Sequence, residues 1–445
     1  MANDLTGRWA ALYFMEKTLD DHLPLDQAFD QACQRFSGKL LPRDRAFTRH
    51  LGTTCLRHLG QLDAMINHCT AKNLGQKKKS VRNILRLAIT QLLYMAVPAH
   101  AAVNSAVEMI TKNHDKSLYH SKGMVNAILR RIERERKIFS SSFAPELNIP
   151  KWLRQDWTTR YGEGVVSRMA RQFLAEPPLD FTLKPDGDRQ EWADRLGGTI
   201  LANGSIRVEK AGIVQNMSGY DDGAWWVQDV AASLPASLLG AKAGDAVLEL
   251  CAAPGGKTAQ LAAMGCRVTA LDQSARRLRR LTENMARLEL SCDVMTSDAV
   301  DYLTALHSGQ AGKYGHILLD APCSATGTLR RHPDVIRSRT RKDIESLAAL
   351  QSRLLDAAVR VMPAGTVLIY CVCSLQAEEG PDQIKALLNR NSSVKRKEIR
   401  RDEVAGFEQA VLETGDMQTL PHYLPGGMDG FFISRLVKLS DNQTE

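Results

Sequence analysis

The sequence predicts a multidomain protein: an all-α N-terminal domain, a small α+β middle module and a C-terminal α/β domain built on a doubly wound sheet. Three observations predict this division. At 445 residues the chain is too long for one compact domain. Residues 1–140 show helical periodicity and almost no strand pattern, whereas short strands and helices alternate from about residue 225. We therefore expect domains at 1–140, 146–224 and 225–440.

Apolar residues recur at helical spacing in the N-terminal third. They predict helices within Val81–Val97, over Ala101–Thr111 and over Met124–Lys137. Pro98 should end the first helix, because proline cannot donate the backbone hydrogen bond that continues the turn. The segment Ser140–Pro145 is typical of a linker.

The middle module is predicted from shorter patterns. Two short helices are expected at Trp152–Tyr161 and Gly164–Leu174, and Pro177 and Pro178 follow them. Strand-like runs separated by glycine, aspartate and asparagine come next, at Phe181–Leu183, Thr199–Leu201 and Ile206–Val208.

The C-terminal third alternates buried strands with helices. The predicted strands are Ala246–Leu250, Arg267–Asp272, His316–Asp320 and Thr366–Tyr370, and a long helix is expected around Ile344–Val361. This alternation indicates a parallel sheet with helices on both faces, in which ligands bind at the carboxyl ends of the strands.

Composition excludes several classes of protein. Apolar residues make up 44% of the chain and charged residues 24%, which is ordinary for a soluble globular protein, and we expect no membrane span. The nine cysteines are scattered, so we expect a reducing cytoplasm rather than a disulfide framework. Since no CxxC pair is present, we expect no metal site.

The positive charge is concentrated at the N-terminal end. Residues 1–150 hold 22 lysines and arginines against 13 acidic residues, whereas the rest of the chain holds 36 against 37. A polyanion such as nucleic acid is the expected partner of this region, although a merely solvated basic face is the alternative. Lys77, Lys78 and Lys79, with Arg82 and Arg86, are expected to form one basic patch.

A Gly-rich loop follows the first strand of the α/β domain, as Cys251-Ala252-Ala253-Pro254-Gly255-Gly256-Lys257. Its glycines permit close approach of the backbone to a ligand, although a tight structural turn is the alternative. Asp272 ends the next strand, where a carboxylate can accept bonds from both ribose hydroxyls; otherwise it caps a helix. Asp298 is expected where the third strand ends, within reach of an adenine amine.

Two further cysteines stand at strand ends. Cys323 ends Leu319-Asp320-Ala321-Pro322-Cys323, and Cys373 follows 50 positions later in Cys371-Val372-Cys373-Ser374. With a nucleotide-type loop, two such thiols suggest covalent chemistry on an electron-poor carbon, as in methylation of cytosine at carbon 5. The alternative for a free cysteine is a small buried apolar side chain. We expect that role for Cys33, Cys55, Cys69, Cys266 and Cys292.

These motifs resemble those of the RNA 5-methylcytosine methyltransferases. Leu250–Thr258 resembles that family's S-adenosylmethionine loop, and Asp320–Ser324 and Cys373-Ser374 resemble its two cysteine motifs in the same order. Arg330–Asp334 and Asp429–Phe432 match as well.

The N-terminal third resembles a different protein. Asn83–Tyr94 and Met124–Arg130 are similar to the helical RNA-binding domain of the antitermination factor NusB. Together the two resemblances indicate the bacterial 16S ribosomal RNA methyltransferase B type, also called RsmB or Fmu, over nearly the whole chain.

The resemblance implies a fold and a reaction. It implies a NusB-like domain, a Rossmann-like methyltransferase domain, S-adenosylmethionine as cofactor and one cytosine of 16S rRNA, that at position 967 of the RNA, as target. Small-subunit rRNA outside the mature ribosome is the expected partner, and a monomer is expected. The cofactor residues would be Cys251, Ala252, Ala253, Pro254, Gly255, Gly256, Lys257, Asp272, Asp298 and Asp320.

The resemblance also assigns catalytic roles. Cys373 would attack carbon 6 of the ring, Asp320 would hydrogen-bond the cytosine, and Cys323 would act in release of the product. Cys323 would then need a polar or electropositive site that lowers the pKa of its thiol, and Lys257 could contribute to it. This chain departs from the family at Cys371-Val372, where Ser or Thr followed by Thr is usual.

Three other functions remain open on sequence alone. The same chemistry could act on transfer RNA, although the NusB-like region argues against it. A non-catalytic ribosome-assembly factor would not need both Cys323 and Cys373. Methylation of a base amino group would prefer an Asn/Asp-Pro-Pro-aromatic motif, which Asp320-Ala321-Pro322-Cys323 does not provide.

Overall fold

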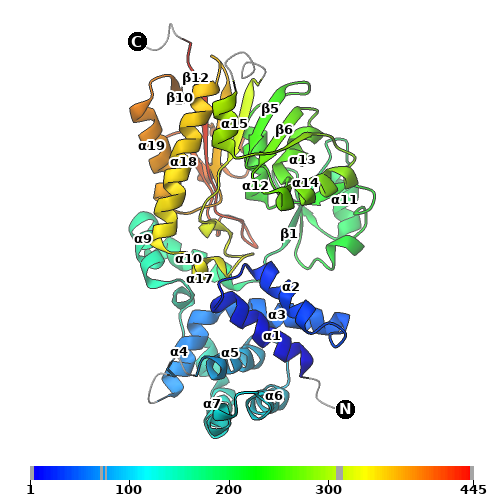
Figure 1. Ribbon diagram of the computed structural model, residues 1–445, viewed down its shortest axis with the longest axis vertical. Helices are drawn as coiled ribbons and strands as arrows, with labels where there is room; N and C mark the ends of the chain where they lie inside the picture. The colour runs from blue at the N-terminus through cyan, green and yellow to red at the C-terminus, as the bar shows by residue number, and fades with distance from the viewer. Residues whose placement is uncertain (1–4, 71–73, 76–77, 307–313, 441–445) are drawn as a thin grey trace. The chain divides into compact units, whose positions relative to one another are not determined.

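The structure is a computed structural model that describes residues 5–70, 74–75, 78–306 and 314–440 (Figure 1). The chain divides into two compact units. Unit 1 comprises residues 1–175 and 329–338, and unit 2 comprises residues 176–328 and 339–445. No helix within the described ranges is both long and apolar enough to cross a membrane.

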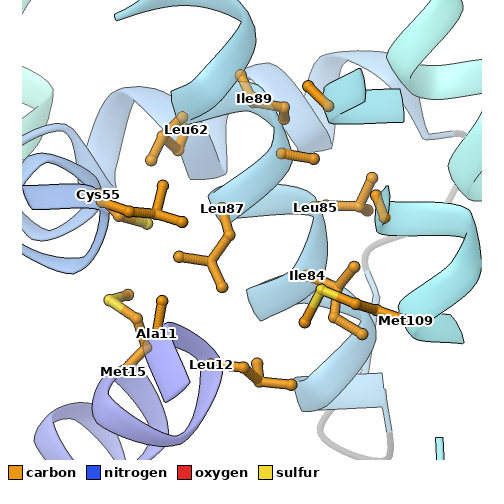
Figure 2. Close-up of a cluster of buried hydrophobic side chains, with 14 of the residues drawn as sticks. Ala11, Leu12, Met15, Cys55, Leu62, Ile84, Leu85, Leu87, Ile89 and Met109 are labelled. Atoms are coloured by element: carbon orange, nitrogen blue, oxygen red, sulfur yellow. The ribbon is translucent and has the colours of Figure 1, made fainter. Parts of the chain in front are cut away.

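Unit 1 is helical, and its core surrounds the helix α5 (Lys79–Leu93). Figure 2 shows side chains of α5, such as Ile84 and Leu87, among those of other helices, such as Leu12 and Met109. Burial of apolar surface on several sides of α5 is the main stabilising contribution here. The helices of unit 1 that precede α5 and follow it are α1 (Thr6–Leu19), α2 (Leu25–Arg35), α3 (Pro42–Arg57), α4 (Leu59–Cys69), α6 (Ala99–Thr111), α7 (Lys122–Arg134), α8 (Arg136–Ser141), α9 (Lys151–Tyr161) and α10 (Glu163–Leu174).

Three sequence predictions in unit 1 were wrong in their bounds. The helix expected over Met124–Lys137 is two helices, α7 and α8, which meet at Glu135. The helix expected within Val81–Val97 ends at Leu93, with Tyr94 as its C-cap, and Pro98 does not end it but is the N-cap of α6. The ring of Tyr94 stacks on His58 at 3.7 Å. The linker expected over Ser140–Pro145 is partly structured, since α8 runs to Ser141 and a 3₁₀ turn covers Pro145–Asn148.

The basic patch expected near α5 is largely paired with acidic side chains. Arg82 and Arg86 both contact Asp63, at 3.2 and 2.7 Å. Lys79 contacts Asp20 at 3.0 Å. Lys77 lies outside the described residues. The net positive charge of this surface is therefore smaller than the sequence suggests.

A short segment from the C-terminal third belongs to unit 1. Residues 329–338 include α17 (Val335–Ser338) and lie between the two cysteine motifs in sequence. The carboxylate of Asp334 accepts a bond from Leu25 N at 3.1 Å, and the guanidinium of Arg337 donates to Asn148 O at 2.7 Å. The chain therefore leaves unit 2 after Thr328 and re-enters it at Arg339.

Unit 2 begins with a small antiparallel sheet of order β2-β3-β1-β4. Trp225 and Trp226 are both buried. Trp225 packs edge-on against Phe181, with ring centroids 4.6 Å apart, and belongs to the core of this module. The elements of this module are β1 (Leu179–Leu183), α11 (Arg189–Leu196), β2 (Thr199–Ile200), β3 (Ile206–Val208) and β4 (Trp225–Val227).

The large sheet has the order β10-β12-β9-β8-β5-β6-β7, and β11 pairs with β12. The five strands from β7 to β9 in this order are parallel, and β12 is antiparallel to β9. The strands are β5 (Ala246–Leu250), β6 (Arg267–Asp272), β7 (Asp293–Thr296), β8 (His316–Asp320), β9 (Val367–Val372), β10 (Val394–Arg396), β11 (Met417–Gln418) and β12 (Phe432–Lys438).

Helices cover both faces of this sheet, as expected for a doubly wound domain (Figure 1). Alternate strand residues pack on opposite sides, so that Leu318 faces one helix layer and Leu319 the other. The strand order reverses between β5 and β8, which is where ligands bind in such sheets. One face carries α12 (Val230–Leu238), α13 (Gly256–Ala263) and α14 (Ala275–Arg287), and the other carries α15 (Ala299–Ala305), α18 (Arg341–Val361) and α19 (Pro381–Arg390).

Candidate active site

The Gly-rich loop joins β5 to α13 at the carboxyl edge of the large sheet. Its backbone is unusual: Cys251 has φ 61°, the Ala253–Pro254 peptide bond is cis, and Gly255 has φ 101°. A Cβ added to Gly255 would lie 2.6 Å from Cγ of Leu281, so a side chain is excluded there by both conformation and space. The loop thus presents main chain toward the sheet edge.

Asp272 lies beside this loop at the end of β6. Its buried carboxylate accepts bonds from Ala253 N at 3.2 Å and from Ser274 N at 2.9 Å. The helix α14 is capped by the hydroxyl of Ser274, so the N-cap alternative for Asp272 was wrong. Arg277, which sequence reasoning missed, donates to Asp272 at 3.2 Å and also to Ala253 O.

Asp298 reaches the same place from the next strand. Its carboxylate caps α15 by accepting bonds from Val300 N at 2.8 Å and Asp301 N at 3.2 Å. Asp272 and Asp298 both line one cavity, together with Cys251 and Pro322. The structure therefore brings the predicted nucleoside-binding residues together.

Asp320 is paired with a lysine and a thiol. Its carboxylate accepts from Lys257 Nζ at 2.7 Å and from the Cys371 thiol at 3.4 Å. Burial lowers the pKa of Lys257, but the charges of Asp320 and Cys371 outweigh it, so this pKa is raised and the lysine stays cationic. The ring of Phe431 lies 5.1 Å from Nζ and covers this ion pair. Lys257 thus orients Asp320.

Cys371 is a buried member of the sheet rather than part of the thiol pair. It lies opposite Asp320 in the register of β8 and β9. Burial and the Asp320 carboxylate raise the pKa of the Cys371 thiol well above its ordinary value. Since β9 ends at Val372, Cys371 donates a hydrogen bond from within the strand and Cys373 stands just beyond it.

The two cysteines predicted to carry the chemistry are in contact. The Sγ atoms of Cys323 and Cys373 lie 3.4 Å apart, although 50 residues separate them in the chain. The expectation that the surroundings lower the pKa of Cys323 was wrong. The hydrogen bond to Cys373, burial and the negative charges of Cys373 and Glu379 raise it well above its ordinary value. In the resting site, Cys323 therefore carries its proton.

Glu249 is a second residue that sequence reasoning missed. It lies within β5 and is fully buried, and neither carboxylate oxygen has a hydrogen-bond partner among the described residues. Burial raises its pKa to about 8, against the opposing effects of the neighbouring Thr258 hydroxyl and of the charge of Lys257. Glu249 could have been found from the sequence, because it is an ionisable residue within the apolar run Ala246–Leu250.

The remaining cysteines are free thiols, and the five expected to be structural pack against apolar clusters. Only Cys55 and Cys266 are fully buried, whereas Cys33, Cys69 and Cys292 are half-buried. Their surroundings are otherwise those of small apolar side chains.

Comparison with known protein families gives two matches. A family model described as 16S rRNA methyltransferase RsmB/F matches residues 236–437, and the NusB family model matches residues 9–134. The two matched ranges fall in unit 2 and unit 1 respectively, apart from the short segment that belongs to unit 1.

Curated relatives match over nearly the full length. Ribosomal RNA small subunit methyltransferase B of Vibrio vulnificus is 32% identical over 445 residues, covering 97% of this chain and 99% of the relative. The protein of the same name from Cronobacter sakazakii is 31% identical over 414 residues, covering 90% and 92%.

Solved structures share the fold. The crystal structure of PH0851 matches with a TM-score of 0.75 at 20% identity and covers 98% of this chain and 99% of that one. NSun6 from Pyrococcus horikoshii, solved with SFG, matches with a TM-score of 0.53 at 20% identity and covers 66% and 99%. At these identities the likeness concerns the fold alone.

Proposed function

Because this chain belongs to the family of the ribosomal RNA small subunit methyltransferases B, we propose that it transfers a methyl group from S-adenosylmethionine to carbon 5 of a cytosine in 16S rRNA. The observation that carries the proposal is the 3.4 Å contact between the thiols of Cys323 and Cys373, beside a cavity lined by carboxylates. The proposal includes cytosine 967 as target, RNA outside the mature ribosome as substrate, and a monomeric cytoplasmic enzyme. It also includes the three sequence domains 1–140, 146–224 and 225–440.

The cavity residues fit S-adenosylmethionine. Asp272 offers a buried carboxylate to ribose hydroxyls, and Asp298 offers a second one to an adenine amine. The peptide groups from Cys251 to Gly256 can approach the cofactor closely, because Gly255 has no side chain. When bound, the cofactor supplies an electrophilic methyl group on a sulfonium.

Cys373 supplies the nucleophile in this proposal. Carbon 5 of cytosine reacts poorly by itself, and a bond from Sγ of Cys373 to carbon 6 makes carbon 5 electron-rich. Asp320, held by Lys257 at 2.7 Å, stabilises the ring as charge develops on it. Carbon 5 then takes the methyl group.

Cys323 acts in release. It removes the proton from carbon 5, the ring double bond re-forms, and Sγ of Cys373 leaves. The hydrogen bond to Cys373 is the largest cause of the raised pKa of Cys323. Once the sulfur of Cys373 is bonded to carbon 6, it is a thioether and no longer holds the proton of Cys323 in that hydrogen bond. Cys323 therefore becomes easier to ionise at the step where a base is required.

The helical unit would contact the RNA backbone. The net charge of +9 over residues 1–150 favours a polyanion, and the NusB family match over residues 9–134 supports RNA as that polyanion. The target base must leave any stack before Cys373 can reach it, so an unpaired or flipped cytosine is the expected form.

Transfer of labelled methyl from S-adenosylmethionine to small-subunit rRNA tests this proposal. We expect the label in 5-methylcytosine, a loss of at least about 10⁴-fold in Cys373→Ala, and a trapped covalent RNA adduct in Cys323→Ala. Cys266→Ala, a buried cysteine just before the amino end of β6 and therefore away from the carboxyl strand ends, is the matched control and should keep the wild-type rate.

Two outcomes would overturn the proposal. Methyl incorporation that survives Cys373→Ala would remove the nucleophile from it. Label on transfer RNA, or on a nucleotide other than cytosine, would show that the proposed substrate is wrong.

A further inference from the structure

A buried carboxylate lies behind the two thiols. Glu379 ends a 3₁₀ turn (Ala377–Glu379) after β9, and its side chain is fully buried. One carboxylate oxygen accepts from Ser324 N at 2.8 Å and from Gln351 Nε2 at 3.2 Å. The other accepts from the hydroxyl of Ser324 and from that of Ser374, the latter at 2.5 Å. Four donors from three segments of unit 2 thus converge on one side chain.

The partners of Glu379 are the residues next to the thiols. Ser324 follows Cys323 and Ser374 follows Cys373 in the chain. The N–H of Ser324 belongs to the peptide group that Cys323 itself contributes, so the bond to Glu379 fixes the backbone directly after this cysteine. A single carboxylate therefore holds the two cysteine loops at a common point.

Other contacts of the same residues limit the freedom of both loops. Gln351, which donates to Glu379, also donates to Pro322 O at 2.9 Å, just before Cys323. Thr326 contacts the hydroxyl of Ser374 at 3.2 Å and accepts from Leu375 N at 3.0 Å. These hydrogen bonds connect the two cysteine loops beside the thiol pair. Glu379 is the acceptor that Gln351 and Ser374 share.

Glu379 is itself held in place by the sheet. Its carbonyl oxygen accepts from the hydroxyl of Tyr370, a fully buried residue of β9, at 2.5 Å. Buried donors that lose their acceptor cost more free energy than a typical hydrogen bond contributes, so this network resists displacement. The position of the carboxylate is therefore set by the fold and not by solvent.

We propose that Glu379 is a positioning residue, which keeps Sγ of Cys323 and Sγ of Cys373 within 3.4 Å of each other by bonding the serine after each cysteine. This inference rests on the proposed function, in which one thiol attacks and the other assists release. Neither oxygen of Glu379 needs to touch RNA. Because a misplacement of about 1 Å can cost about 100-fold in rate, a change here acts on catalysis without a change in binding groups.

The substitution Glu379→Gln keeps the size of the side chain but changes the hydrogen bonds that it can accept. The amide oxygen can still accept from Ser324 N and Gln351, but the amide nitrogen then faces the hydroxyls of Ser324 and Ser374, which can no longer donate to it. The matched control is Glu378→Gln, the same substitution one residue earlier. The side chain of Glu378 is 43% exposed and lies 3.9 Å from Arg341.

Single-turnover methyl transfer with the full-length chain tests the inference. We expect Glu379→Gln to be about 10 to 100-fold slower than wild type, while the Kd for S-adenosylmethionine and the Kd for the RNA stay within about twofold. Glu378→Gln should match wild type in all three. With Cys323→Ala in both backgrounds, the covalent adduct should also form more slowly when Glu379→Gln is present.

A second series covers the case in which Glu379→Gln does not fold. Ser374→Ala and Ser324→Ala each remove one donor, and each should slow methyl transfer by about threefold to tenfold at unchanged cofactor affinity. Where both fold, Ser374→Ala combined with Glu379→Gln should be about as slow as Glu379→Gln alone, because both remove one shared contact.

The thiols give a readout that needs no RNA. The negative charge of Glu379 is one cause of the raised pKa of Cys323, after the hydrogen bond to Cys373 and burial. The pH profile for alkylation of Cys323 by iodoacetamide, followed by peptide mass analysis, should therefore move to lower pH in Glu379→Gln. An unchanged profile would show that the Glu379 carboxylate does not lie close behind Cys323 in solution, which would overturn the positioning role.

The failures of the two proposals differ in this design. A folded wild-type enzyme that transfers no methyl group overturns the proposed function. An active wild type with Glu379→Gln within twofold of its rate overturns the positioning role, as does a rate loss matched by an equal loss of cofactor affinity.

Discussion

The two ends of the proposed active site lie along one edge of the same sheet, yet they are built in different ways. The cofactor end consists of the loop 251–256, Asp272 and Asp298, and it relies on main-chain shape with two carboxylates. The thiol end consists of Asp320, Cys323, Cys371, Cys373 and Glu379, and it relies on contacts between side chains.

This difference indicates what each end tolerates. At the cofactor end, backbone N–H groups and Arg277 satisfy the carboxylates. The oxygen of an amide can still accept from such N–H groups, so an Asp→Asn change there should alter affinity more than the shape of the loop. At the thiol end, each polar group is the partner of another, so removing one leaves a buried group unpaired. We therefore expect changes at the thiol end to act on rate and changes at the cofactor end to act on binding.

Among the substitutions that compare the two ends, Asp320→Asn should give the largest effect on rate. The substitution keeps the size of the side chain but leaves the ammonium of Lys257, which is only 9% exposed, without its countercharge. Because the amide no longer stabilises charge that develops on the ring as the carboxylate does, we expect methyl transfer to fall about 10³-fold. Cofactor affinity, measured by calorimetry, should fall by less than about tenfold.

A surface aspartate provides the control for this substitution. Asp356→Asn removes a carboxylate that pairs with Arg390 at 2.9 Å on the exposed side of α18. Such pairs contribute about 0–1 kcal/mol, so its rate should match wild type. A rate for Asp320→Asn equal to that of Asp356→Asn would show that the thiol end does not depend on this contact.

Asp272→Asn should act mainly on binding. Loss of its negative charge weakens hydrogen bonds to ribose hydroxyls, and bonds to charged groups contribute about 1.5–3 kcal/mol. We expect the Kd for S-adenosylmethionine to rise about 10 to 100-fold, while the rate at saturating cofactor stays within about threefold of wild type. An equal loss in rate at saturation would erase the distinction between the two ends.

Sequence reasoning located the strand ends because their chemistry is local. Ala246–Leu250 and His316–Asp320 are apolar runs of strand length, and each is followed directly by the residues that matter. The cofactor loop, Asp272 and Cys323 could therefore be assigned to one edge of the sheet from the sequence alone. The topology rule for parallel sheets then brought them together.

Residues that act across the fold gave no such signal. Glu378 and Glu379 are neighbours with the same side chain, yet one is exposed and the other is the shared acceptor behind the thiols. The segment 329–338 follows Cys323 closely in sequence and still belongs to the helical unit. Long-range packing alone distinguishes Glu379 from Glu378 and assigns residues 329–338 to the helical unit. The residue types in these segments do not indicate that packing.

Glu249→Gln should have the smallest effect on the reaction and a distinct effect on stability. The pKa of Glu249 is raised to about 8 by burial in the folded state, against an ordinary value of 4.5. Between these two values the folded chain holds a proton that the unfolded chain has released. Stability from this group is therefore complete below about pH 4.5 and is lost as the pH rises through about 8.

The neutral amide of Glu249→Gln removes that loss, because it has no charge to bury. We expect the Tm of the variant relative to wild type to rise by several degrees between pH 6 and pH 9, with methyl transfer at pH 7 within about twofold. Glu413→Gln is the control, since Glu413 is exposed and its substitution should leave the Tm difference flat with pH. A flat profile for Glu249→Gln as well would mean that Glu249 is ionised in the folded protein. The ammonium of Lys257 would then neutralise Glu249 as well as Asp320. The thiol end would in that case include Glu249 of β5, although among the described residues no hydrogen bond connects the carboxylate of Glu249 to it.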